Sequence, residues 1–163
     1  MTTLTAARLR EVLRYDRVTG VFIWRVDVGR WGRIKAGTVA GCRKDGYIVI
    51  RVDGVLHRAN RLAWLYEKGE WPVGEVDHEN GVKHENWFDN LRDVPMRVNR
   101  QNIRKAHVTN QLGTLGVTAI DDRFKVQLWV DGRNKHMGYF DTEAEATACH
   151  LAAKRASHEG CTI

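Results

Sequence analysis

The chain has few cysteines and no long apolar stretch. Its 163 residues include three cysteines, Cys42, Cys149 and Cys161, which are widely spaced and form no Cys-x-x-Cys pair. This usage is typical of reduced thiols in a cytoplasmic protein and argues against a structural zinc site. No apolar run approaches the length needed to span a membrane, and residues 1–5 lack the charged and apolar regions of a signal peptide. We therefore expect a cytoplasmic protein with no membrane partner.

Positive charge and apolar residues for a core are both present. Lys and Arg together number 26 against 20 acidic residues, which gives a net charge of +6, and 43% of the residues are hydrophobic. The length suits one domain of ordinary size or two small ones. The charge favours a polyanionic partner, nucleic acid before membrane, although a basic protein without such a partner has the same composition.

Short helices and strands are predicted for the N-terminal half. Thr5 can cap a helix, Asp53-Gly54 is a strong hairpin signal, and Gly69 can end a helix. Apolar spacing around these signals predicts a helix after Thr5, strands at residues 21–24, 47–52 and 55–57, a basic glycine-rich loop at 27–37, and a helix at 60–68.

The pair Asp77-His78 is the main candidate for chemistry. It ends a short apolar approach that we interpret as a strand, and Asn90 and Asn99 follow 12 and 21 residues after His78. A carboxylate and an imidazole are what a hydrolase needs to hold a hard metal ion and to deprotonate a water molecule. An isolated Asp-His pair is more often a structural hydrogen bond, so the two asparagines and their spacing carry the interpretation.

A helix is expected from about Pro95 to Lys105, because proline suits the first helical turn. Asn99 would lie on its inward face with two apolar residues, Met96 and Ile103. A buried amide needs a partner, and the Asp77-His78 pair, through a metal, could supply it. The neighbouring face would carry a row of arginines that suits a phosphate backbone or is simply a solvated face, namely Arg97, Arg100 and Arg104.

The last third of the chain is predicted to form a separate small unit. Residues 106–113 are polar and look like a linker, and Thr142 with Glu145 forms a capping box that opens a helix running to about residue 157. Strands are expected at 116–120, 124–130 and 135–140. The result would be a three-stranded antiparallel sheet backed by one helix.

Alternation along the middle strand separates a buried face from an exposed one. Lys125, Gln127 and Trp129 lie on the exposed face, with Arg123 and Arg133 at the strand ends. These side chains can contact bases and phosphates, although an ordinary exposed sheet face could carry the same residues.

Together, Asp77-His78, Asn90 and Asn99 resemble the HNH (ββα-metal) endonuclease finger of phage and intron-encoded enzymes. Upstream segments resemble phage members too, including Thr19-Gly20-Val21-Phe22-Ile23-Trp24, Arg61-Leu62-Ala63-Trp64 and Gly69-Glu70-Trp71-Pro72. Arg61 becomes a candidate DNA contact. Asn60 departs from the family, in which many members have a histidine.

The resemblance implies a role for each of the four central residues. His78 would be the general base, and Asp77 and Asn99 would hold one divalent cation, Mg²⁺ or Mn²⁺. Asn90 would brace the loop and position the phosphate. Oxygen ligands favour magnesium over zinc, which we do not expect.

The C-terminal third is similar to the APETALA-type (ethylene-response-factor-like) DNA-binding domain. The similarity rests on Gly116-Val117, Phe124-Lys125-Val126-Gln127-Leu128, Gly132-Arg133, His136-Met137-Gly138-Tyr139-Phe140 and the helix that contains Ala146. It implies that the sheet enters the major groove of DNA. Phe124 stands where a tryptophan is common, and Trp129 stands where a basic residue is common.

We therefore expect an α+β protein with an HNH endonuclease domain at 1–105, whose finger is at about 74–105, a linker at 106–113, and an APETALA-type domain at 114–163. It would nick or cut double-stranded DNA, targeted partly by the C-terminal sheet, as a monomer or weak dimer in the cytoplasm of a bacterial or phage-infected cell. The alternative is an inactive DNA-binding, packaging or regulatory accessory protein that keeps the HNH fold.

Overall fold

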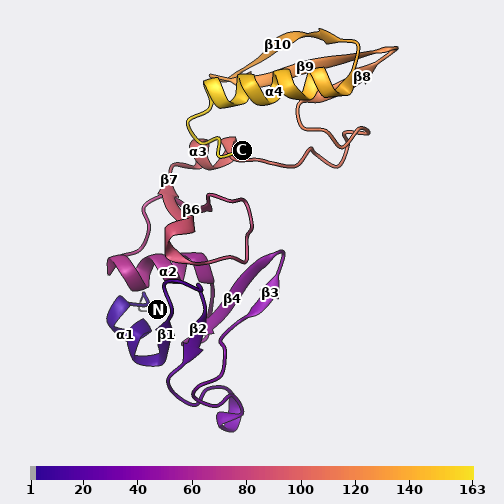
Figure 1. Cartoon of the computed structure of the whole chain (residues 1–163). Helices are drawn as coiled ribbons and strands as arrows, with labels where there is room; N and C mark the ends of the chain where they lie inside the picture. The colour runs from indigo at the N-terminus through magenta and orange to yellow at the C-terminus, as the bar shows by residue number, and fades with distance from the viewer. Residues whose placement is uncertain (1–2) are drawn as a thin grey trace. The chain divides into compact units, whose positions relative to one another are not determined.

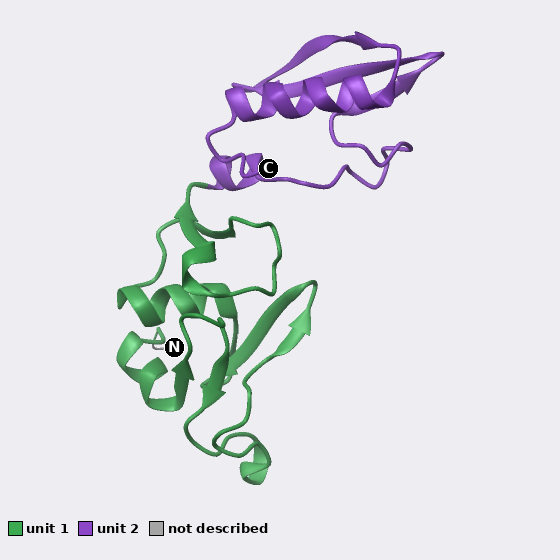
Figure 2. Cartoon of the chain, in the orientation of Figure 1, with its two compact units in different colours: residues 1–95 green, residues 96–163 purple. Residues whose placement is uncertain are grey.

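The structure is a computed structural model that describes residues 3–163, and the chain folds into two compact units (Figure 2). They are Met1–Pro95 and Met96–Ile163. The part of the chain described contains four α-helices and four small antiparallel sheets, a mixed α and β structure. None of the helices at residues 3–163 has the length and apolarity to cross a membrane. The expected domain limits at 105 and 114 stay a prediction.

The first unit is built on two α-helices and three of the sheets (Figure 1). Leu9, Leu13, Phe22, Leu62 and Leu65 are almost fully buried in one core, and each such side chain contributes roughly 1.5–3 kcal/mol. The α-helices and strands of this unit up to residue 68 are α1 (Ala6–Val12), β1 (Leu13–Tyr15), β2 (Phe22–Trp24), β3 (Cys42–Lys44), β4 (Tyr47–Val52), β5 (Val55–Arg58) and α2 (Ala59–Lys68).

Local signals in the sequence account for the ends of these elements. Thr5 caps α1 by accepting a hydrogen bond at its hydroxyl from the backbone N–H of Arg8. Asp53 and Gly54 have positive φ angles of 47° and 84° and connect β4 to β5, as a two-residue hairpin turn requires. The expected cap and hairpin are therefore confirmed.

A separate two-stranded sheet follows α2 in the first unit. It pairs β6 (Glu75–His78) with β7 (Leu91–Val94), and a short 3-10 helix, η2 (Phe88–Asn90), precedes β7. Asn60, which is 3% exposed on α2, donates from its amide nitrogen to the carbonyl of Val76 at 2.7 Å. The asparagine that departs from the family pattern thus anchors the strand that carries Asp77 and His78.

The second unit contains the expected three-stranded sheet, with the strands in the order β8 (Val117–Ile120), β9 (Arg123–Val130) and β10 (Arg133–Phe140). The helix α4 (Glu143–Ser157) begins at the predicted capping box of Thr142 and Glu145. It packs on the sheet through a small core of Val117, Val126 and Ala146.

The helix predicted for residues 95–105 is shorter than expected and buries a different face. α3 (Met96–Gln101) ends four residues early, and its buried side chain is Val98. Met96 and Ile103, predicted to face inward, are each 53% exposed. The prediction that Met96 and Ile103 face inward is therefore wrong, and Arg104 lies beyond the helix.

Val98 faces inward because α3 contacts residues far away in the chain, and local periodicity cannot reveal such a contact. Gly160 lies so close to α3 that a Cβ there would come within 2.1 Å of the Val98 carbonyl oxygen. The Gly160 N–H donates to the Gln101 side chain at 3.0 Å, and the Thr162 hydroxyl contacts the amide oxygen of Asn102 at 2.6 Å. Residues 160–162 thus select which face of α3 is covered.

Candidate active site

Asp77 and His78 are adjacent on β6, so their side chains leave opposite faces of the strand pair. Asp77 pairs across the sheet with Arg92, whose Nε and Nη2 donate to the same carboxylate oxygen at 3.1 and 2.8 Å. Both side chains are largely buried. A buried carboxylate requires such a partner, because an unpaired buried charge is strongly destabilising.

The imidazole of His78 is held by the side chain of Asn86. His78 is 3% exposed, and its Nε2 lies 3.1 Å from the amide oxygen of Asn86. The amide nitrogen of Asn86 donates to the carbonyl of His84 at 3.0 Å, which fixes the oxygen on the side of the ring. The Nε2 of His78 therefore carries the hydrogen, and Nδ1 is the nitrogen that can accept a proton.

Burial also determines the charge of this ring. Removal from water lowers the pKa of His78, while the bond to Asn86 and the charge of Asp77 oppose that shift. The net direction is downward from the usual value near 6.5. His78 is therefore a neutral imidazole at neutral pH, the protonation state that a general base needs.

Asn86 is the site residue that sequence reasoning missed. It is buried, and its backbone carbonyl accepts a hydrogen bond from the Tyr15 hydroxyl at 2.6 Å, which ties it to the core of the first unit. Its partner His78 is eight residues away in the chain, so no local pattern identifies the contact. The available signal was weak: one more asparagine, four residues before Asn90.

The side chain of Asn90 joins the two sides of the loop that connects β6 to β7. Its amide nitrogen donates to the carbonyl of Glu85 at 2.8 Å, and its amide oxygen accepts from the N–H of Asn80 at 3.0 Å. These contacts hold residues 79–90 in one conformation. A contact of Asn90 with phosphate stays a prediction.

Asn99 lies on α3 in the second unit, whereas Asp77 lies in the first. Their joint binding of a metal stays a prediction. No group of three or more His, Cys, Asp or Glu side chains suited to a metal occurs among residues 3–163. The expected ligands are different in kind, one carboxylate and one amide oxygen, and such hard oxygen donors suit magnesium or manganese.

The basic residues predicted to contact DNA are found in varied surroundings. Arg61 donates to the carbonyl of Gly74 at 3.1 Å. Arg97 forms an exposed ion pair with Glu159 at 2.5 Å, and Arg104 donates to the Thr162 hydroxyl at 2.6 Å. Arg100 is exposed on α3. Their DNA contacts stay predictions.

The middle strand of the second unit places four predicted residues on one face, Arg123, Lys125, Gln127 and Trp129, since they alternate with the buried positions of β9. Trp129 is 63% exposed, and Arg123 pairs with Asp141 at 3.0 Å. Arg133 is exposed at the start of β10. Their contacts with DNA also stay predictions.

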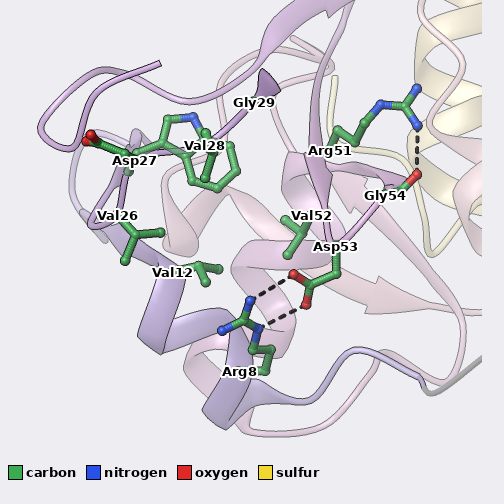
Figure 3. Close-up of a pocket in the computed structure, with 11 residues that line it drawn as sticks. Arg8, Val12, Val26, Asp27, Val28, Gly29, Arg51, Val52, Asp53 and Gly54 are labelled. Atoms are coloured by element: carbon green, nitrogen blue, oxygen red, sulfur yellow. Dashed lines mark hydrogen bonds and ion pairs between the residues drawn. The ribbon is translucent and has the colours of Figure 1, made fainter. Parts of the chain in front are cut away.

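A pocket of about 350 Å³ in the first unit (Figure 3) offers carboxylates as well, but they are engaged in structural contacts. Both oxygens of Asp53 accept from the Arg8 guanidinium at 2.9 and 3.0 Å. Asp27 accepts from the Lys35 ammonium and from the N–H of Ala36. We therefore place the candidate chemistry at β6 and β7, not in this pocket.

Comparison with known proteins gives one match. Residues 57–101 match the family model described as HNH endonuclease. The matched segment contains α2, the β6–β7 pair and α3, and thus Asp77, His78, Asn90 and Asn99. No curated protein and no solved structure matches the chain. The family match implies DNA as the substrate and suggests a DNA-cleaving hydrolase, while the APETALA-type resemblance at 114–163 stays a prediction.

Proposed function

From the HNH match at residues 57–101, we propose that this chain is a metal-dependent DNA endonuclease with His78 as its general base. The observation that carries the proposal is the contact between His78 and Asn86. A neutral imidazole that is held at Nε2 by an amide oxygen has the protonation state and the fixed orientation that a general base needs.

In the proposed reaction, Nδ1 of His78 accepts a proton from a water molecule. The water oxygen forms a bond to the phosphorus of a DNA phosphodiester, and the bond from phosphorus to the 3′ oxygen breaks. The 3′ oxygen leaves with its electron pair and takes up a proton from solvent, and the phosphate stays bonded to the 5′ oxygen of the next nucleotide.

Asp77 and Asn99 would hold one divalent cation, Mg²⁺ or Mn²⁺, through a carboxylate and an amide oxygen. Such a cation, when bound, would stabilise negative charge on the phosphate and on the leaving oxygen. Arg92, which donates to one oxygen of Asp77, orients that carboxylate. Asn90 would keep the loop shaped for the phosphate through its bonds to Glu85 and Asn80.

The exposed face of β9 would provide much of the targeting in this proposal. Lys125, Gln127 and Trp129 share that face, and side chains of these types can contact base edges, sugars and phosphates. The arginines 61, 97, 100 and 104 would add phosphate contacts that position the DNA without reading its sequence.

One observation favours a second candidate, an inactive DNA-binding or packaging accessory protein. Asp77 is paired with Arg92, and His78 is 3% exposed. The ion pair and the burial are also what we expect if Asp77 and His78 have a purely structural role in an HNH fold that has lost its activity. A direct activity test separates the two candidates.

The test is a nicking assay on supercoiled plasmid with Mg²⁺, with Mn²⁺ and with EDTA. We expect the native protein to nick DNA only with a divalent cation, and His78→Ala to be slower by roughly 10²–10⁴-fold. His107→Ala, which removes an exposed histidine of the second unit, is the matched control. Intact plasmid with both cations would favour the accessory protein, and an active His78→Ala would exclude His78 as the base.

Targeting needs a point variant instead of a deletion, because residues 160–162 contact α3. We expect Lys125→Ala combined with Gln127→Ala to change the distribution of cut sites on random DNA and to leave the rate of nicking at saturating DNA nearly unchanged. An unchanged cut-site distribution would remove the readout role from β9.

A further inference from the structure

A cluster of two cations and an aromatic ring lies beside His78 in the first unit. The guanidinium carbon of Arg58 is 4.2 Å from the ring centre of Tyr47, and Nζ of Lys83 is 4.9 Å from the same centre. The Tyr47 ring centre is in turn 6.1 Å from that of His78. We call Tyr47, Arg58 and Lys83 the Tyr47 cluster.

Three separate segments of the first unit build this cluster. Tyr47 begins β4, Arg58 ends β5, and Lys83 lies in the loop between β6 and β7. A Cβ on Gly46 would lie 3.4 Å from Cδ of Lys83, so the turn between β3 and β4 lies directly against that loop (Figure 1). The loop whose shape depends on Asn86 and Asn90 therefore also positions Lys83.

The cations of this cluster have no acidic partner among the described residues of the first unit. Arg58 and Lys83 form no ion pair with any residue from 3 to 163, in contrast to Arg8, Arg17 and Arg92. Both are exposed. Two like charges held over one ring repel each other, and the ring offsets this only in part. A polyanion would neutralise both.

A shallow pocket of about 230 Å³ lies beside Tyr47 and extends this surface over the sheet of β3, β4 and β5. Its lining includes Arg58 and a further lysine, Lys44, together with one carboxylate, Asp45. Lys44 is opposite Tyr47 across the β3–β4 turn. Lys44 and Arg58 thus lie on the same face of the sheet as Tyr47.

We propose that the Tyr47 cluster binds the phosphate backbone of duplex DNA next to the phosphate that is cut. The proposal rests on the proposed function, because it takes His78 as the reacting centre. Arg58 and Lys83 contact phosphates, and Tyr47 orients both cations through its ring. Since the ring already contacts two cations, Tyr47 does not stack on a base.

The test measures binding of a fluorescent random duplex in EDTA, where no cleavage competes, as a function of salt concentration. For Arg58→Gln combined with Lys83→Gln, we expect the slope of log affinity against log salt to become shallower by about 2, and the affinity at low salt to fall about tenfold. The matched control is Arg30→Gln combined with Lys68→Gln, which removes two cations that also lie over aromatic rings of this unit, those of Trp31 and Trp64.

Equal losses in the control would overturn the proposal, because they would reflect net charge alone. An RNA duplex of the same sequence that binds more tightly, with the same loss in the double variant, would also overturn it. Plasmid nicking by the native protein is scored separately. If the native protein nicks DNA but the Arg58 and Lys83 double variant binds like the control, this inference is wrong and the proposed function stands. If the native protein does not nick DNA, the proposed function is wrong, and the binding result is judged by itself.

A second variant pair tests the role of the ring. We expect Tyr47→Phe to bind like the native protein, since the ring stays, and Tyr47→Leu to lose part of the salt slope, since the cations are no longer oriented. Chemical denaturation of each variant verifies that the first unit is folded. A Tyr47→Phe variant as weak as Tyr47→Leu would show that the hydroxyl, not the ring, matters and would overturn the role given to Tyr47.

Discussion

The two units use polar side chains in opposite ways. In the first unit, the candidate chemistry is buried: His78, Asn86 and Asn90 are each nearly inaccessible and are tied by hydrogen bonds to the loop or to one another. In the second unit, the candidate contact residues of β9 alternate with buried positions and reach solvent, and Trp129 is 63% exposed.

Their cores differ as well. The first unit packs many large side chains around Leu9, Phe22 and Leu62, whereas the buried cluster of the second unit is Val117, Val126 and Ala146. A rigid core suits a site whose groups must stay within a fraction of an ångström of their working positions. A thin sheet-and-helix unit is sufficient for a surface that only has to present side chains to a partner.

The largest effect expected from this comparison is that of Asn86→Ala. In this variant, Nε2 of His78 would lose its hydrogen-bond acceptor. We therefore expect kcat for nicking to fall about 10–100-fold with little change in KM. The free energy of unfolding of the first unit should fall by roughly 1–3 kcal/mol. The ¹⁵N chemical shifts of His78 report its tautomer directly and should show loss of the Nε2–H form.

Asn86→Asp is the conservative control for that prediction, because it keeps an oxygen acceptor opposite Nε2. We expect it to retain the Nε2–H tautomer of His78. If Asn86→Ala left both the tautomer and kcat unchanged, the buried network would have no part in positioning the ring.

Val126→Ala tests how strongly the stability of the second unit depends on its small core. Val126 is fully buried between the sheet and α4, and we expect the variant to lose roughly 1–3 kcal/mol of unfolding free energy, enough to unfold the second unit first on heating. The neighbouring Gln127→Ala is the control, since it should weaken DNA binding without loss of stability. Hydrogen exchange resolved along the chain distinguishes the two units, and equal protection of β9 in both variants would contradict the prediction.

A smaller effect is expected at the start of α4. Thr142→Ala removes one half of the capping box and should lower the free energy of unfolding of the second unit by about 1 kcal/mol. Thr147→Ala changes the same residue type inside the helix, where threonine has no capping role, and should cost less. A larger loss for Thr147→Ala in thermal unfolding would exclude the cap as a stabilising feature.

The smallest effect is a dependence on pH in the second unit. Burial lowers the pKa of His150, and the charge of Lys154 lowers it further. The folded unit therefore binds fewer protons than the unfolded chain, in which the pKa is about 6.5. Stability should be level above about pH 6.5 and should decrease as the pH falls below it. In His150→Gln, the loss of stability at low pH should be smaller, as measured by hydrogen exchange of β8–β10. An unchanged pH profile would show that other groups cause the loss.

Much of the fold was predictable because its signals are local. Asp53-Gly54 formed the expected hairpin, Thr142 and Glu145 formed the expected capping box, and the alternation along β9 gave the correct buried face. Each depends on residues that are close in the chain, where backbone preference and side-chain period decide the structure.

The remainder depended on contacts between distant residues. Asn86 gained its partner His78 only because the loop folds back on β6, and α3 turned Val98 inward because Gly160 lies against it. The spacing of apolar residues within a single helix or loop could not identify either contact. For the same reason the roles of Asp77, His78, Asn90 and Asn99 stay predictions of the sequence that the family match supports as a group.

The contacts between α3 and residues 160–162 have a consequence for synthesis of the protein. They join positions about sixty residues apart, such as Gln101 with Gly160 and Asn102 with Thr162, and give this helix a high contact order. An isolated helix of this length is unstable in water. While a ribosome is still translating the second unit, the nascent chain therefore already has its proposed base on β6, but Asn99 does not yet lie on a formed helix. Under the proposed function, in which Asn99 holds the cation, cleavage would begin only after residue 162 has left the ribosome.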